Sequence, residues 1–268
     1  MSAPPAPASW SDLVAELDCW HAAGRLATLW WRDDDAGTAT AALDRLVRIA
    51  DGVPLTLAVI PAAAGPELAA WRELAAERGH RLGIIQHGWQ HRDHAGNGKK
   101  SEFPAGRSGP AAADDLAAGR QRLVGLFGAA ALPVLAPPWN RFDDSLLRLL
   151  PEAGIAALSR LGSRRTKAVA AGVVEVNVHA DLVAWKAGRG FLGTAAALAL
   201  IAGHLRARRQ GAADPAEPTG ILTHHLVQEA AAEAFLAELL ALTRRHPAVR
   251  WLDAAEIFAP AAGAEAGA

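Results

Sequence analysis

Short apolar runs alternate with stretches of helical periodicity along most of this chain. In the helical stretches apolar residues recur every three or four positions, whereas the short runs are continuous, which is typical of strands buried on both faces. The predicted helices cover 11–23, 38–50, 66–78, 111–127, 143–150, 191–209 and 227–245. The predicted strands cover 27–31, 53–60, 82–85, 132–136, 155–158, 173–178, 221–223 and 249–252.

This alternation continues without a break in composition, and it favours one α/β domain with mostly parallel strands. We therefore expect a single distorted (β/α) barrel over residues 27–258, preceded by a helical extension over 1–26 and followed by a flexible tail over 259–268. The chain has 268 residues, of which 51% are hydrophobic, and can bury one sizeable core.

Composition narrows the possible partners and the compartment. A formal net charge of −1 gives no general attraction to nucleic acid or to an anionic membrane. The single cysteine, Cys19, excludes an internal disulfide and fits a reducing compartment. The first ten residues show no secretory pattern, and no apolar run is long enough to span a bilayer, so we expect a cytoplasmic protein. The oligomeric state is left open.

Polar clusters follow several of the predicted strands, which is where parallel barrels carry their catalytic residues. These clusters lie at 33–35, 87–91, 137–140, 179–181 and 224–225. His87 and His91 are four residues apart, a spacing that brings two imidazoles to one metal ion on a single helical turn. Each cluster alone has a structural explanation as a cap, a turn or a packed side chain. Together they supply carboxylate and imidazole ligands, a further carboxylate and a separate imidazole, which favours one catalytic site.

The order of these clusters resembles that of the NodB-homology polysaccharide deacetylases, which are metal-dependent de-N-acetylases. The segment 79–91 resembles the most specific family motif, although two extra residues precede His87. The other four motifs of the family are resembled, in the same order, by 32–37, 136–139, 178–185 and 222–224. The resemblance thus extends from about residue 27 to 225 and implies a NodB-type barrel.

The resemblance implies a divalent metal held by Asp35, His87 and His91, with zinc expected and cobalt, nickel or iron as alternatives. It also implies that Asp34 acts as general base on a metal-activated water. His224 would protonate the departing amine.

Other residues are implied to surround these groups. A backbone N–H near Trp139, next to Pro138, would bind the developing oxyanion. Asp181 would orient the ring of His224, and His179 and Asp33 would support the site. We expect His225 to point away from the pocket and to pack or to cap the next helix.

Two departures from the family pattern matter. The third motif has Ala136 where the family has an arginine that pairs with an aspartate. The first motif offers three aspartates where the family has two, so the register Asp33–Asp34 is an alternative to Asp34–Asp35. Adjacent strand residues point to opposite faces, and only a bend lets both members of a pair reach one ion.

The expected function is hydrolysis of an N-acetyl amide on a small-molecule or oligosaccharide substrate that contains an amino sugar. One alternative is a cytosolic amidohydrolase that acts on a small amide or ureide. A second is a non-catalytic descendant that binds carbohydrate, which the loss of arginine at Ala136 would favour. A third, a metal-dependent phosphoesterase, would need more cations near the metal than the Lys99–Lys100 loop provides.

Overall fold

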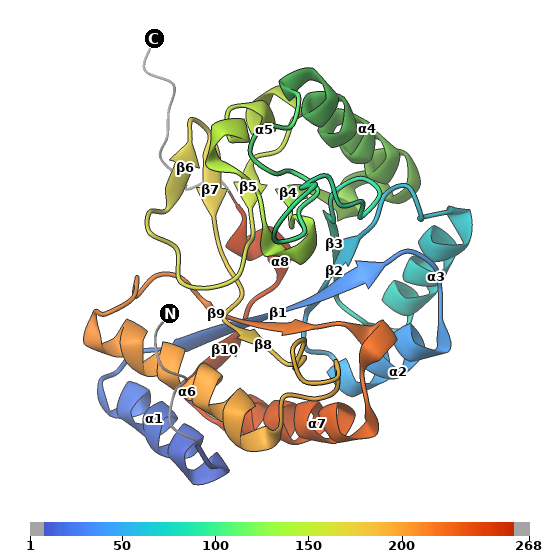
Figure 1. Ribbon diagram of the computed structural model, residues 1–268. Helices are drawn as coiled ribbons and strands as arrows, with labels where there is room; N and C mark the ends of the chain where they lie inside the picture. The colour runs from blue at the N-terminus through green and yellow to red at the C-terminus, as the bar shows by residue number, and fades with distance from the viewer. Residues whose placement is uncertain (1–7, 260–268) are drawn as a thin grey trace.

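A curved sheet of ten strands forms the centre of the computed structural model, which describes residues 8–259 (Figure 1). The strand order is β6-β7-β5-β4-β3-β2-β1-β9-β8, and β10 pairs with the first residues of β1. All pairs are parallel except β6 with β7. The strands are β1 Ala27–Ala36, β2 Leu55–Val59, β3 Leu82–Gln86, β4 Ala131–Leu135, β5 Ala157–Leu158, β6 Ala168–Ala170, β7 Val173–Glu175, β8 Ala180–Asp181, β9 Thr219–Thr223 and β10 Val249–Trp251.

Helices cover the outer face of this sheet, and the predicted (β/α) barrel is confirmed as a mostly parallel half-barrel. The α-helices are α1 Trp10–Ala22, α2 Ala41–Ala50, α3 Pro66–Glu77, α4 Gly109–Phe127, α5 Leu149–Glu152, α6 Thr194–Gln210, α7 Ala230–Arg245 and α8 Ala254–Ile257. Short 3₁₀ turns are η1 Gly128–Ala130, η2 Pro138–Asn140, η3 Asp144–Leu146 and η4 His225–Val227. No helix of the described part is both long and apolar enough to cross a membrane.

The two faces of the sheet have separate cores, as strand alternation requires. Leu29 and Trp31 of β1 pack in the large outer core, whereas Trp30 packs in the smaller inner core. The ring of Phe258 meets Trp30 edge-on with centroids 5.6 Å apart. Because Ala254 of α8 lies close to Gly83 near the start of β3, α8 covers the amino-terminal end of the half-barrel. The carboxyl-terminal ends of the strands are not covered by α8, and the polar clusters lie there.

Several local predictions were wrong at their edges. The first strand continues to Ala36 in place of ending at 31, so the aspartates are part of the strand. The first helix was predicted to begin at residue 11, but α1 begins at Trp10 and is capped by Ser9. The predicted helix 143–150 is divided between η3 and α5, and β6, β8 and α8 were not predicted. Residues 1–7 of the predicted extension and 260–268 of the predicted tail lie outside the described residues.

Candidate active site

Three consecutive aspartates end β1, and their side chains point in different directions. Asp33 accepts hydrogen bonds from the Thr223 hydroxyl at 2.6 Å and from the backbone N–H of His225 at 3.0 Å, and it contacts His225 Nδ1 at 2.5 Å. Asp34 lies on the opposite, inner face of the strand. Asp35 has a φ of 71°, and this bend turns its carboxylate back toward the inner end of the barrel. The structure therefore places Asp35, not Asp33, beside the two histidines.

Asp35, His87 and His91 converge around one point. Asp35 Oδ1 lies 3.2 Å from His87 Nε2 and 3.3 Å from His91 Nε2, and one ligand atom from each residue lies within 4.8 Å of the others. His87 Nδ1 lies 2.9 Å from the carbonyl oxygen of Ala136 and donates to it, so the lone pair of His87 Nε2 faces Asp35. Asp35 Oδ1 is buried and has no hydrogen-bond partner among residues 8–259. Two imidazoles and an unsatisfied carboxylate oxygen fit a divalent metal ion.

The charges of this cluster are interdependent. Burial raises the pKa of Asp35, but the nearby imidazoles of His87, His224 and His91 outweigh burial and hold that pKa below its usual range. Burial lowers the pKa of His87, but Asp34 and Asp35 outweigh it, and the net direction is upward. Burial and the neighbouring His87 lower the pKa of His91. The carboxylate is therefore held ionised, which is the form that binds a metal.

The prediction that one helical turn joins His87 to His91 was wrong, because this segment is an irregular loop. Gly88 has a φ of 62°, and a Cβ there would lie 1.8 Å from Glu102 Oε2, so only glycine fits. Glu102 accepts hydrogen bonds from the backbone N–H groups of Trp89 at 3.1 Å and Gln90 at 2.8 Å. It is fully buried within a loop whose composition is polar, and nothing in the sequence distinguished it.

Asp34 is paired with a residue that the sequence reasoning did not assign. Arg32 Nε lies 2.8 Å from Asp34 Oδ1, and Arg32 Nη2 lies 3.0 Å from Asp34 Oδ2. Both side chains are buried. Arg32 is two residues before Asp34, so strand alternation puts both side chains on the inner face. This spacing is the feature of the sequence from which the pair could have been predicted.

His224 lies between two carboxylates at the end of β9. Its Nε2 is 4.0 Å from Asp34 Oδ2, and its Nδ1 is 4.0 Å from Asp181 Oδ1. Asp181 does not hydrogen-bond to His224 but accepts from Trp185 Nε1 at 2.7 Å and from the Val183 N–H at 3.0 Å. Burial raises the pKa of Asp181. The Trp185 ring meets the His224 ring edge-on at 4.7 Å, so His224 is enclosed without being bonded.

Trp139 and Pro138 complete the group, in the turn η2 after β4. Trp139 has a φ of 56°, and its ring centroid lies 4.3 Å from that of His91. Pro138 is buried beside the backbone of Gly88. Left-handed backbone at Asp35, His91 and Trp139 is concentrated where the ligand residues meet, as is common at functional sites.

The predicted place of His179 next to this group was wrong. Its ring stacks on that of His204 with centroids 3.4 Å apart, and its Nε2 lies 3.4 Å from Glu217 Oε2. His179 Nδ1 accepts a hydrogen bond from the Gly220 N–H, so the proton of the neutral ring is on Nε2. That proton and the 17° angle between the stacked rings leave no position in both ring planes for one metal. We interpret this second cluster as structural.

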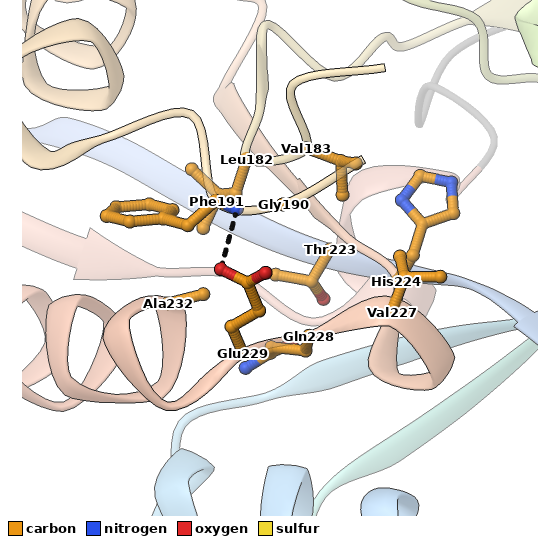
Figure 2. Close-up of a pocket in the computed structure, with 10 residues that line it drawn as sticks. All are labelled: Leu182, Val183, Gly190, Phe191, Thr223, His224, Val227, Gln228, Glu229 and Ala232. Carbon is orange, nitrogen blue, oxygen red and sulfur yellow. Dashed lines mark hydrogen bonds between the residues drawn. The ribbon is translucent and has the colours of Figure 1, made fainter. Parts of the chain in front are cut away.

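A small cavity of about 10 Å³ lies next to His224, between the segment after β8 and the start of α7. Figure 2 shows that the His224 imidazole points away from the Phe191 and Glu229 side chains that line it. Glu229 accepts a hydrogen bond from the Phe191 N–H at 3.3 Å at its edge. The cavity has room for about one water and does not form part of the group around Asp35.

No protein-family model and no curated protein matches the chain. Solved structures do. A family 4 carbohydrate esterase from Streptomyces lividans, in complex with acetate, has a TM-score of 0.51 and 16% identity, over 83% of this chain and 90% of the esterase. A family 4 acetyl xylan esterase from Clostridium thermocellum, with a cobalt ion, has a TM-score of 0.53 and 16% identity, over 86% and 90%. A peptidoglycan N-acetylglucosamine deacetylase has a TM-score of 0.51 and 14% identity, over 89% of this chain and 96% of the deacetylase.

At these identities the similarity establishes the fold. The mostly parallel half-barrel and the strand-end position of the polar clusters agree with what the sequence motifs implied. The chain has the fold of the family 4 carbohydrate esterases and NodB-type polysaccharide deacetylases that its motifs resemble.

Proposed function

We propose that this protein is a metal-dependent hydrolase that removes an N-acetyl group from an amino-sugar substrate. The observation that carries the proposal is the convergence of Asp35, His87 and His91 next to Asp34 and His224 at one end of the half-barrel. These side chains come from three strand ends far apart in sequence. Amide hydrolysis needs a metal site, a general base and a proton donor. Two imidazoles and one carboxylate can form the metal site, and a second carboxylate and a separate imidazole can serve as base and proton donor.

Asp35, His87 and His91 would hold the ion, and zinc is the metal we expect. When bound, such an ion polarises the substrate carbonyl and lowers the pKa of water. The donor set of two nitrogens and one carboxylate oxygen also suits cobalt, nickel or iron. The structurally similar acetyl xylan esterase from Clostridium thermocellum was solved in complex with a cobalt ion, which supports metal binding by this fold.

Asp34 would accept the proton of the attacking water. Its carboxylate lies beside the ligand cluster and is held in one plane by the Arg32 guanidinium. His224, on the other side of Asp34, would donate a proton to the nitrogen of the departing amine. The backbone N–H of Trp139 would hydrogen-bond to the developing oxyanion. Asp181 would keep a carboxylate next to the His224 ring, on the side opposite Asp34.

A polar cleft beside Asn140 supports a carbohydrate substrate. It has a volume of about 440 Å³ and adjoins the turn that carries Trp139. Arginine, asparagine, serine and threonine side chains line it, including Arg160, Ser163 and Asn177. Many hydrogen-bond donors around a space of this size suit a hydroxyl-rich sugar better than an apolar ligand.

The test is acetate release from N-acetylated chito-oligosaccharides by protein loaded with zinc, with O-acetylated xylan oligosaccharides as the ester comparison. Asp34→Asn should keep the metal and lose at least about 10²-fold in kcat. Asp35→Asn should lose both metal and turnover. Asp51→Asn, a change at an exposed carboxylate on another part of the surface, should lose neither.

Each outcome has a definite meaning. Acetate from xylan alone would make the protein an esterase. Ammonia from a ureide or amide would favour the small-amide alternative, and phosphate release from a phosphomonoester would favour the phosphoesterase. Asp34→Asn with normal turnover would remove the assignment of the base. A metal-loaded protein that binds chito-oligosaccharide without releasing product would be the non-catalytic descendant.

A further inference from the structure

Arg32 is a fully buried cation in the middle of the candidate active site. It lies on the inner face of β1 with no exposed surface. Burying an isolated guanidinium is costly unless its charge and its N–H groups are all matched. The partners that match it therefore show what the residue does.

The four N–H groups on Nη1 and Nη2 of Arg32 donate hydrogen bonds, and Nε is in ion-pair contact with Asp34. Nη2 donates to Asp34 Oδ2 at 3.0 Å, and Nε lies 2.8 Å from Asp34 Oδ1, so one edge of the guanidinium faces both carboxylate oxygens through a hydrogen bond and an ion-pair contact. Nη2 also donates to Asn140 Oδ1 at 2.5 Å. Nη1 donates to the backbone carbonyl and the hydroxyl of Ser159 at 3.0 and 2.8 Å. One side chain thus joins the carboxyl-terminal ends of β1, β4 and β5.

This arrangement fixes two elements of the proposed chemistry. The fork of Arg32 holds both oxygens of Asp34, so the carboxylate cannot rotate without breaking an ion pair in a water-poor site. The contact with Asn140 also ties the turn η2 to β1, and Trp139 precedes Asn140 in that turn. Ser159 holds the far end of the guanidinium, so Arg32 itself has one orientation.

The contacts of Arg32 matter because Ala136 stands where the family motif has an arginine. The resemblance would place an arginine there to pair with an aspartate, but the Ala136 side chain is a buried methyl group with no charge, and the Ala136 carbonyl accepts from His87 Nδ1. We infer that Arg32 is the positioning residue for Asp34, and that it supplies from β1 the guanidinium that the β4 motif lacks. This inference rests on the proposed role of Asp34 as the base, and it removes the main argument for a non-catalytic descendant.

A double-mutant cycle on zinc-loaded protein tests the coupling. Arg32→Lys keeps the charge but cannot form the fork, and it should lower kcat by about 10–100-fold while KM changes by less than about threefold. In the Asp34→Asn background the same change should lower kcat by less than about twofold, because a residue that acts through Asp34 has nothing left to position. An equal loss in both backgrounds would overturn the inference.

Arg208→Lys is the matched control. Arg208 is also buried, at 2% exposure, and binds Thr28 and Thr219 away from the proposed site. The Arg208→Lys variant should have a lower free energy of unfolding than the wild type but an unchanged kcat. If Arg32→Lys does not fold, Ser159→Ala is the second variant. It removes only one contact to Nη1 and should lower kcat by about 2–5-fold, and an unchanged kcat there would contradict the inference.

A readout that needs no activity separates this inference from the proposed function. Crystal structures of the wild type and of Arg32→Lys should show one Asp34 rotamer in the first, and a rotated or divided carboxylate with a shifted η2 turn in the second. Absence of acetate release by the wild type would refute the proposed function alone. An unchanged Asp34 and η2 in Arg32→Lys would refute the positioning role alone.

Discussion

The buried histidine His204 should make the protein lose stability in mild acid. Its ring is 8% exposed, stacks on His179 at 3.4 Å and contacts Thr219 Oγ1 through Nδ1 at 2.9 Å. Burial, then the charges of His179 and Arg208, lowers the pKa of His204 from 6.5 to about 2. The folded state therefore keeps this imidazole neutral, whereas the unfolded chain protonates it at its ordinary pKa.

The sign and size follow from proton linkage. Between pH 6.5 and about 2 the unfolded chain binds one more proton at His204 than the folded chain does. The free energy of unfolding therefore falls as pH falls through this range, by about 1.4 kcal/mol per pH unit. Relative to pH 8, His204 alone should cost about 2 kcal/mol at pH 5.

The variant His204→Gln removes the titrating group. Urea unfolding followed by tryptophan fluorescence at pH 5, 6, 7 and 8 gives the free energy of unfolding of both proteins. The packing cost of the substitution is the same at every pH, and effects of the metal and of histidines that do not contact His204 cancel in the difference. The variant should gain about 2 kcal/mol relative to the wild type between pH 8 and pH 5. A difference that stays constant across this range would refute the reasoning.

Three further predictions concern the candidate site. His87→Ala and His91→Ala should each abolish stoichiometric metal binding, because two protein ligands hold zinc too weakly, and metal analysis of the purified variants checks this. His224→Ala should lower kcat by about 10²–10⁴-fold with metal content unchanged, and a variant that keeps its rate would show that the proton donor is another group. His225→Ala should leave most of kcat but lower the free energy of unfolding by about 1–3 kcal/mol, because buried Asp33 would lose the imidazole that contacts its Oδ1 and keep only the hydrogen bonds to Oδ2. Equal stability of His225→Ala and the wild type in urea would contradict that last expectation.

The sequence by itself determined the layout of the protein. Apolar runs and helical periodicity are local properties, and they predicted a mostly parallel (β/α) barrel and the position of Asp34, His87 and His224 at strand ends. Parallel strands bring their carboxyl ends to one side, so these residues were expected to meet. The two-residue strand β8 and the four-residue helix α8 were not predicted, because elements this short are too brief to form a periodic hydrophobic pattern.

Only the tertiary structure decided which atoms meet. Arg32 contacts Ser159 over 127 residues and Asp33 contacts His225 over 192, and no local pattern specifies such pairs. The direction of Asp35 depends on one left-handed residue, and the meeting of His87 with His91 depends on a loop that Glu102 holds. His179 is two residues from Asp181 in sequence, yet it stacks on His204 of α6 because the helix packs there. Side-chain partners are chosen by packing between distant elements, and a single sequence carries the residue types but not that packing.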